Sequence, residues 1–96
     1  MDREEEKIMK AAISAYGRDA QTDMAIEEMS ELTKALLKFR RYGKGDSAND
    51  RLNDIREEIE DVQIMLDQMK IIYGDNPGIR AAKLERLKER MVARNG

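Results

Sequence analysis

The sequence contains no cysteine, no histidine and no tryptophan, and these absences exclude several kinds of functional site. Without cysteine the chain has no disulfide, no thiolate nucleophile, no zinc finger and no iron–sulfur cluster. Without histidine it lacks the usual general base and the imidazole ligand of haem and di-iron sites. Any chemistry of this chain therefore depends on carboxylates, amines, guanidinium groups and a few hydroxyls.

Long apolar runs are missing as well, because no stretch approaches the roughly 18 residues that a membrane span needs. The acidic start of the chain, from Asp2 to Glu6, is unlike the positively charged beginning of a signal peptide. We therefore predict a cytoplasmic protein with no membrane partner.

Charged residues are abundant, at 40% of the chain, with 18 Lys and Arg against 20 Asp and Glu. An average soluble domain has about 25% charged residues. Strand-favouring aromatic residues make up only 4%, whereas Ala, Leu, Ile, Met, Glu, Lys and Arg dominate, which favours helix nearly throughout. Because 96 residues suffice for one hydrophobic core only, we predict a single all-α domain over residues 1–96.

Glycine residues end the first two of four predicted helices. The first helix runs from Arg3 to Tyr16 and stops before Gly17, which we expect in the left-handed conformation. The second helix covers about residues 20–42, with Asp19 as its N-cap, and the segment 43–45 (Gly-Lys-Gly) breaks it.

The third and fourth helices have start signals of their own. Asp46 or Ser47 can cap the third helix, where Ser47 and Asp50 have capping-box spacing, and this helix should reach Tyr73. The dipeptide Asn76-Pro77 combines a cap with a first-turn proline, so it should start a fourth helix that runs towards the C-terminus.

The second and third helices carry apolar residues at steps of three and four, which predicts amphipathic helices. The predicted core residues are Ala25, Met29, Leu32, Leu36 and Phe39, followed by Leu52, Ile55, Ile59, Val62, Leu66, Met69 and Tyr73. We expect these helices to form a long antiparallel hairpin at the centre of a helical bundle. Further apolar residues on the third helix exceed what a small core uses, so we predict a homodimer or homotetramer; they are Ile64, Ile71 and Ile72.

An acidic pattern occurs twice, at an offset of 30 residues, so that Glu28 matches Glu58 and Glu31 matches Asp61. The midpoint between the two blocks falls in the glycine-containing loop. If the helices fold back on each other there, both blocks lie about 20 Å from the turn. Four carboxylates would then face one another across helix axes roughly 8–10 Å apart.

These acids are not placed as surface acids usually are. Glu28 shares a ridge with Met24 and Leu32, and Glu58 likewise interrupts the apolar stripe of the third helix. Like charges three or four residues apart destabilise a helix, and burying several carboxylates costs more unless they gain a proton or a cation. We therefore favour a divalent-cation site over a solvated acidic face.

The ligand type selects the metal, because oxygen-only ligation suits Mg²⁺, with Mn²⁺ as a substitute. Magnesium held by carboxylates usually keeps waters and completes its shell with phosphate oxygens of a substrate. One or two such ions can activate a water and screen phosphate charge. The acidic pattern thus favours metal-assisted hydrolysis of a phosphoanhydride.

The motif Glu27-Glu28-x-x-Glu31, then 26 intervening residues, then Glu58-x-x-Asp61, resembles a known family signature, EExxE…ExxD. It looks like that of the MazG-like nucleotide pyrophosphohydrolases, in the all-α NTP pyrophosphatase superfamily with the dimeric dUTPases. Gln21 before the first block and the segment 61–66 after the second agree with it. The resemblance covers roughly residues 8–73, and the last helix more loosely.

The resemblance implies an enzyme that converts a nucleoside triphosphate and water into the monophosphate and pyrophosphate, by attack at the α-phosphorus. The expected magnesium ligands are Glu28, Glu31, Glu58 and Asp61. The expected catalytic residues are Glu27, Glu28 and Glu31. Glu27 would orient or deprotonate the attacking water; alternatively, it is only a surface acid. Such an enzyme would serve nucleotide-pool housekeeping.

A triphosphate also needs cations from the protein. Lys34 and Lys38 follow the first acidic block, and residues 79–96 have six Lys and Arg against two Glu, a net charge of +4, with a basic stripe at Lys83, Arg86 and Arg90. Each of these residues would suit an ordinary solvated face equally well. Gln21 is a candidate for a hydrogen bond to the base.

Two other functions remain open at this point. A non-enzymatic helical module for oligomerisation would tolerate alanine at Glu28 or Asp61 and would not respond to Mg²⁺. A nucleic-acid binder would use the basic last helix, but the chain is acidic overall, with a net charge of -2, one phenylalanine and no tryptophan. It thus lacks both a strong positive field and stacking platforms, and we predict no nucleic-acid partner.

Overall fold

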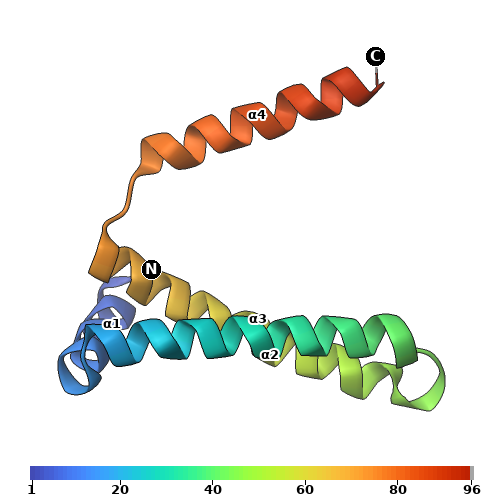
Figure 1. Cartoon of the computed structure of the whole chain (residues 1–96), viewed down its shortest axis with the longest axis horizontal. Coiled ribbons are helices and arrows are strands. Elements are labelled where there is room, and N and C mark those ends of the chain that lie inside the picture. Colours follow the sequence, from blue (N-terminus) through green and yellow to red (C-terminus); the bar gives the residue numbers. More distant parts are fainter. Residues whose placement is uncertain (96) are drawn as a thin grey trace.

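The computed structural model describes residues 1–95, which form four α-helices and one 3₁₀ turn. The helices are α1 (Arg3–Tyr16), α2 (Arg18–Tyr42), α3 (Ala48–Tyr73) and α4 (Pro77–Asn95), and the turn η1 (Gly45–Ser47) precedes α3. No strand occurs in the described residues, so the predicted all-α class is confirmed. Helices α2 and α3 form the predicted antiparallel hairpin, α1 packs at its open end, and α4 stands apart (Figure 1).

The break between α1 and α2 consists of one residue, Gly17. Its φ of 92° is positive as predicted, but its ψ of 159° is extended rather than left-handed helical. The Gly17 amide donates to the Ile13 carbonyl at 2.8 Å, and the chain re-enters a helix at Arg18. The predicted cap at Asp19 is therefore wrong, because so short a break places Asp19 inside the first turn of α2.

The starts of α3 and α4 differ in how their first amides are satisfied. Ser47 precedes α3 with a helical backbone continued from η1, so its side chain makes no capping hydrogen bond and the predicted capping box with Asp50 is wrong. At α4 the Ile79 amide donates to Asn76 Oδ1 at 3.2 Å, which confirms the predicted cap.

The core is small and lies between α2 and α3 and beneath α1. Its buried apolar residues are Met9, Ala25, Ile55, Val62 and Met65. Four more predicted core residues are half-buried, namely Leu32, Phe39, Leu52 and Met69. The remaining five are exposed, so the prediction that they belong to the core is wrong for the single chain; these are Met29, Leu36, Ile59, Leu66 and Tyr73.

Three polar contacts join the hairpin at its open end. Gln21 and Gln68 are buried, and the Gln21 Nε2 donates to Gln68 Oε1 at 2.7 Å. Nearby, the hydroxyls of Thr22 and Tyr73 are 2.7 Å apart, and the Arg18 guanidinium lies 4.7 Å from the Tyr73 ring centroid. Hydrogen bonds from Thr22 and Arg18 lower the pKa of Tyr73. These contacts fix the level at which α2 lies beside α3.

Helix α4 is not packed against the other helices of the described chain (Figure 1). All its residues are exposed, including Leu84, Leu87 and Met91 at 50–53%. The radius of gyration is 17.0 Å, whereas a compact chain of this length has about 12.5 Å. The accessible surface is 7870 Å², against about 5,700 Å² for a compact monomer of 11.1 kDa. The chain therefore exposes about 2,200 Å² more than a compact monomer does.

Within residues 1–95, each helix is too short or too polar to cross a membrane.

Candidate metal centre

The two acidic blocks meet near the middle of the hairpin. Glu28 on α2 and Glu58 and Asp61 on α3 each offer one carboxylate oxygen, and these three oxygens lie within 4.8 Å of one another. Glu28 and Glu58 are half-buried, and Asp61 is exposed. The structure thus brings together three of the four predicted metal ligands, and we call these three residues the acidic cluster.

The apolar neighbours of the cluster explain why acids lie at this edge of the core. On α2, Ala25 sits three residues before Glu28 and is 2% exposed, and on α3, Val62 sits four residues after Glu58 and is 8% exposed. Residues three and four apart occupy one helix face, so burying Ala25 and Val62 also turns Glu28 and Glu58 towards the contact between α2 and α3. The carboxyl groups are therefore placed by packing, at the cost of crowding like charges.

This crowding changes the protonation chemistry of Glu28. Burial raises the pKa of Glu28 above its ordinary value, and the charges of Asp61 and Glu58 raise it further. A hydrogen bond to Glu58 adds to the rise, because a protonated Glu28 can donate to that carboxylate. Glu58 Oε2 is buried and accepts no hydrogen bond from the described residues. An ionised cluster therefore needs a counter-charge, which either a proton or a cation supplies.

The donor set of the cluster fits a hard divalent cation. Magnesium binds oxygen at about 2.0–2.1 Å, so two oxygens on one ion are at most about 4.2 Å apart. The oxygens of the cluster are nearly that close, within 4.8 Å, and a small side-chain movement would bring them onto one ion. A cation would also satisfy the buried Glu58 oxygen. Glu28, Glu58 and Asp61 are therefore the residues that could hold Mg²⁺ or Mn²⁺.

The other two acids of the motif lie outside the cluster. Glu31, one turn further along α2, forms an ion pair with Lys34 at 3.4 Å. This local pairing gives Glu31 a counter-charge that the cluster lacks. Glu27 is exposed, and its charge contributes to the raised pKa of Glu28.

Two small hollows flank the cluster along the groove between α2 and α3. One, of about 110 Å³, is lined by Met24, Glu28, Asp61, Ile64 and Met65. The other, of about 150 Å³, is lined by Glu31, Lys34, Ala35, Lys38, Asp54, Glu57 and Glu58. Sequence reasoning missed Asp54 as a lining residue, although its position four residues before Glu58 places it on the same ridge.

The predicted substrate-binding residues fall into three groups. Lys34 and Lys38 line the second hollow beside Glu31 and Glu58. Gln21 is buried and donates to Gln68, so its amide nitrogen is engaged in the core. The last group lies on α4, away from the groove of its own chain: Lys83, Arg86 and Arg90. Of the predicted cations, the part of the chain that the structure describes brings only Lys34 and Lys38 to the acids.

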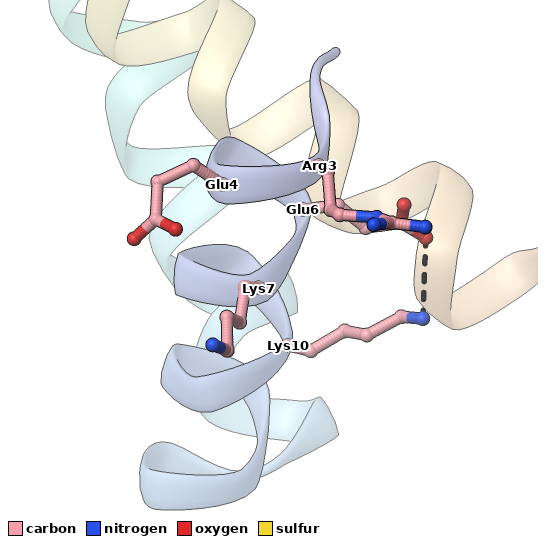
Figure 2. Close-up of a pocket in the computed structure, with 5 residues that line it drawn as sticks. All are labelled: Arg3, Glu4, Glu6, Lys7 and Lys10. Atoms are coloured by element: carbon pink, nitrogen blue, oxygen red, sulfur yellow. Dashed lines mark ion pairs between the residues drawn. The ribbon is translucent and has the colours of Figure 1, made fainter.

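A larger hollow, of about 390 Å³, lies along α1 (Figure 2). All five lining residues come from this one helix: Arg3, Glu4, Glu6, Lys7 and Lys10. Figure 2 shows Lys10 reaching to Glu6, an exposed ion pair of 3.1 Å, while Glu4 and Lys7 lie on the other side. A ligand site needs concave walls and convergent polar groups, which one exposed helix face does not provide.

Comparison of the chain with family models, with curated proteins and with solved structures gives no match in any of the three. The resemblance to the MazG-like pyrophosphohydrolases therefore rests on the acidic motif and its surroundings alone.

Proposed function

We propose that this chain is a magnesium-dependent hydrolase that converts nucleoside triphosphates, ribo or deoxyribo, into the monophosphate and pyrophosphate. The observation that carries the proposal is the acidic cluster, which combines three carboxylate oxygens within 4.8 Å with a buried Glu58 oxygen that lacks a donor. Lys34 and Lys38 beside it supply positive charge for a phosphate chain. We further propose a cytoplasmic role in nucleotide-pool housekeeping.

This arrangement of side chains supports the proposed reaction. Glu28, Glu58 and Asp61 would hold Mg²⁺, which would supply a bound water of lowered pKa and would screen phosphate charge. Lys34 and Lys38 bind the phosphate oxygens and orient the α-phosphorus in the groove. The water oxygen bonds to that phosphorus, the bond to the α–β bridging oxygen breaks, and pyrophosphate leaves. Glu27 and Glu31 flank Glu28 along α2 and are the candidate acceptors of the water proton.

A single chain leaves the triphosphate short of cations, because the basic residues of α4 lie away from its own groove. We propose a homodimer or homotetramer in which Lys83, Arg86 and Arg90 reach the phosphates of another copy. The extra surface of the chain, about 2,200 Å² over a compact monomer, supports such an assembly.

The exposed apolar residues of the hairpin and α4 also favour a second function, a non-enzymatic module for helical oligomerisation. In that case the acidic cluster would be incidental, and Mg²⁺ would change neither stability nor activity.

The test of the proposed function is a pyrophosphate-release assay over normal and modified nucleoside triphosphates with millimolar Mg²⁺. We expect the wild type to release pyrophosphate and Glu28→Gln to lose about 100-fold or more, as enzymes do when one electrostatic group at the reacting centre is removed. Glu60→Gln is the matched control, because Glu60 is an exposed acid of α3 outside the cluster. Orthophosphate as the product would show that a different bond is cut, and inactivity on every substrate would favour the oligomerisation module.

A further inference from the structure

Positive charge gathers at the closed end of the α2–α3 hairpin. Residues 32–45 contain five Lys and Arg and no Asp or Glu, and residues 46–52 add two Asp and one Arg, so this end has a net charge of +4. It lies at the opposite end of the hairpin from α1 (Figure 1). Because the whole chain has a net charge of -2, its charges are strongly segregated.

The cations of this end are open to solvent. Lys38, Arg40, Arg41 and Lys44 are exposed, and in the part of the chain that the structure describes none of the four forms an ion pair. Arg41 is about 20 Å along α2 from Glu28 of the acidic cluster. The Debye length is only about 8 Å at physiological ionic strength, so the cluster does not cancel the positive field here.

An exposed aromatic ring lies among these cations. Tyr42 is 59% exposed, and the Arg51 guanidinium of α3 lies 5.4 Å from its ring centroid, a cation–π contact that holds the ring across the hairpin. The Nε of Arg51 is buried and donates to no acceptor in the described residues. Lys38, Arg41 and Tyr42 fall within about 100° on one side of α2. We call this group of residues the basic tip: Lys38, Arg40, Arg41, Tyr42, Lys44 and Arg51.

We propose that the basic tip binds a single strand of nucleic acid, with phosphates on the cations and a base stacked on Tyr42. Proteins hold single strands by this combination of positive charge and aromatic stacking. A duplex offers phosphates but keeps its base faces inside the stack. A lipid surface needs apolar residues beside the charges, and the loop 43–47 (Gly-Lys-Gly-Asp-Ser) has none. The proposal does not depend on the acidic cluster or on hydrolysis.

The proposal departs from the expectation that composition gives. The chain is acidic overall and poor in aromatic residues, which argues against a nucleic-acid partner. Both arguments average over the whole chain. The structure instead places one exposed ring and five cations at one end of the hairpin, about 20 Å from the acids, and binding depends on this local arrangement.

The test is the fluorescence anisotropy of a labelled oligothymidylate of about 12 nucleotides at several salt concentrations, in EDTA so that the acidic cluster holds no cation. Each phosphate contact with a single strand contributes about -0.7 to the slope of log K against log salt, so five cations predict a slope of about -3.5. Arg40→Gln combined with Arg41→Gln should reduce the slope to about -2. Arg3→Gln combined with Lys7→Gln on α1 is the matched control, because it removes the same charge from exposed positions and should keep the wild-type slope.

Tyr42 distinguishes a single strand from other polyanions. Tyr42→Ala should weaken binding about 5- to 150-fold, the loss of one stacked base, whereas Tyr42→Phe keeps the ring and should bind as the wild type does. Binding of a duplex of the same length should be insensitive to Tyr42→Ala. Circular dichroism should show that every variant stays helical, because the substituted residues are exposed.

Four outcomes would overturn the proposal. They are absence of binding at low salt, equal slopes for the two double variants, equal binding by Tyr42→Ala and Tyr42→Phe, and tighter binding to phosphatidylserine vesicles than to the oligonucleotide. The last result would make the basic tip a lipid-binding surface.

Discussion

Glu28 is the residue at which packing and electrostatics conflict most. Because burial and neighbouring acids raise its pKa above 4.5, the folded chain binds this proton more tightly than the unfolded chain does. The sign follows from linkage: the free energy of unfolding falls as pH rises from about the unfolded pKa to the folded one.

We predict that Glu28→Gln removes this pH dependence and stabilises the metal-free protein at neutral pH. Relief of like-charge contacts on a helix should contribute about 0.2–0.5 kcal/mol. Urea unfolding in EDTA at several pH values, at one protein concentration, measures the effect. Glu60→Gln should leave the pH dependence of the wild type in place, and a Glu28→Gln protein that is less stable at neutral pH would contradict the account of the cluster.

Gly17 is the residue whose conformation allows α2 to follow α1 without a loop. Its φ of 92° with ψ of 159° belongs to a region that is essentially restricted to glycine. We expect Gly17→Ala to lower the free energy of unfolding by about 1–3 kcal/mol, although open space surrounds the position. Equal denaturation midpoints for Gly17→Ala and the wild type would show that this turn is not strained by a side chain.

At the scale of the helices, the sequence predicts which segments are helical but not how each helix begins. Heptad and ridge spacing lies within one helix, so α2 and α3 are found with nearly correct bounds. Capping depends on backbone angles outside the helix. Two predicted caps are therefore wrong, because Ser47 ends a 3₁₀ turn and Gly17 has an extended ψ, whereas the cap at Asn76, followed by a proline, is confirmed.

The pair Gln21–Gln68 shows a limit of the same kind. Gln21 is predicted to donate to a nucleotide base, whereas its partner in the structure is Gln68, which is 47 residues away on another helix. Only the hairpin register reveals such a pair.

We predict that Gln21→Leu costs about 1–3 kcal/mol, because it leaves the buried Gln68 amide without its partner. Replacing both residues by leucine should be nearly neutral, since no polar group then remains unsatisfied. Urea unfolding of the two single variants and the double variant measures this coupling. Additive losses in the double variant would mean that the bond does not join the helices.

At the scale of the whole molecule, prediction and structure differ in which apolar residues are buried within the chain. Spacing identifies Met29, Leu36, Ile59 and Leu66 as apolar-face residues, but it does not separate a seam that packs within the chain from one that packs outside it. The structure separates them by burial, and it leaves these four residues and α4 exposed. The acidic pattern that occurs twice, 30 residues apart, did predict that the two acidic blocks meet. The loop lies midway between the blocks, so a hairpin places both at the same distance from the turn.

Binding of Mg²⁺ by the acidic cluster is the central claim, and calorimetric titration of Mg²⁺ into metal-free protein tests it most directly. Wild type and Glu60→Gln should bind Mg²⁺ and gain about 2.7 kcal/mol of stability at a hundredfold excess over Kd, whereas Glu58→Gln should lose most of the binding. Absence of binding in the wild type, or equal binding by Glu58→Gln, would contradict it.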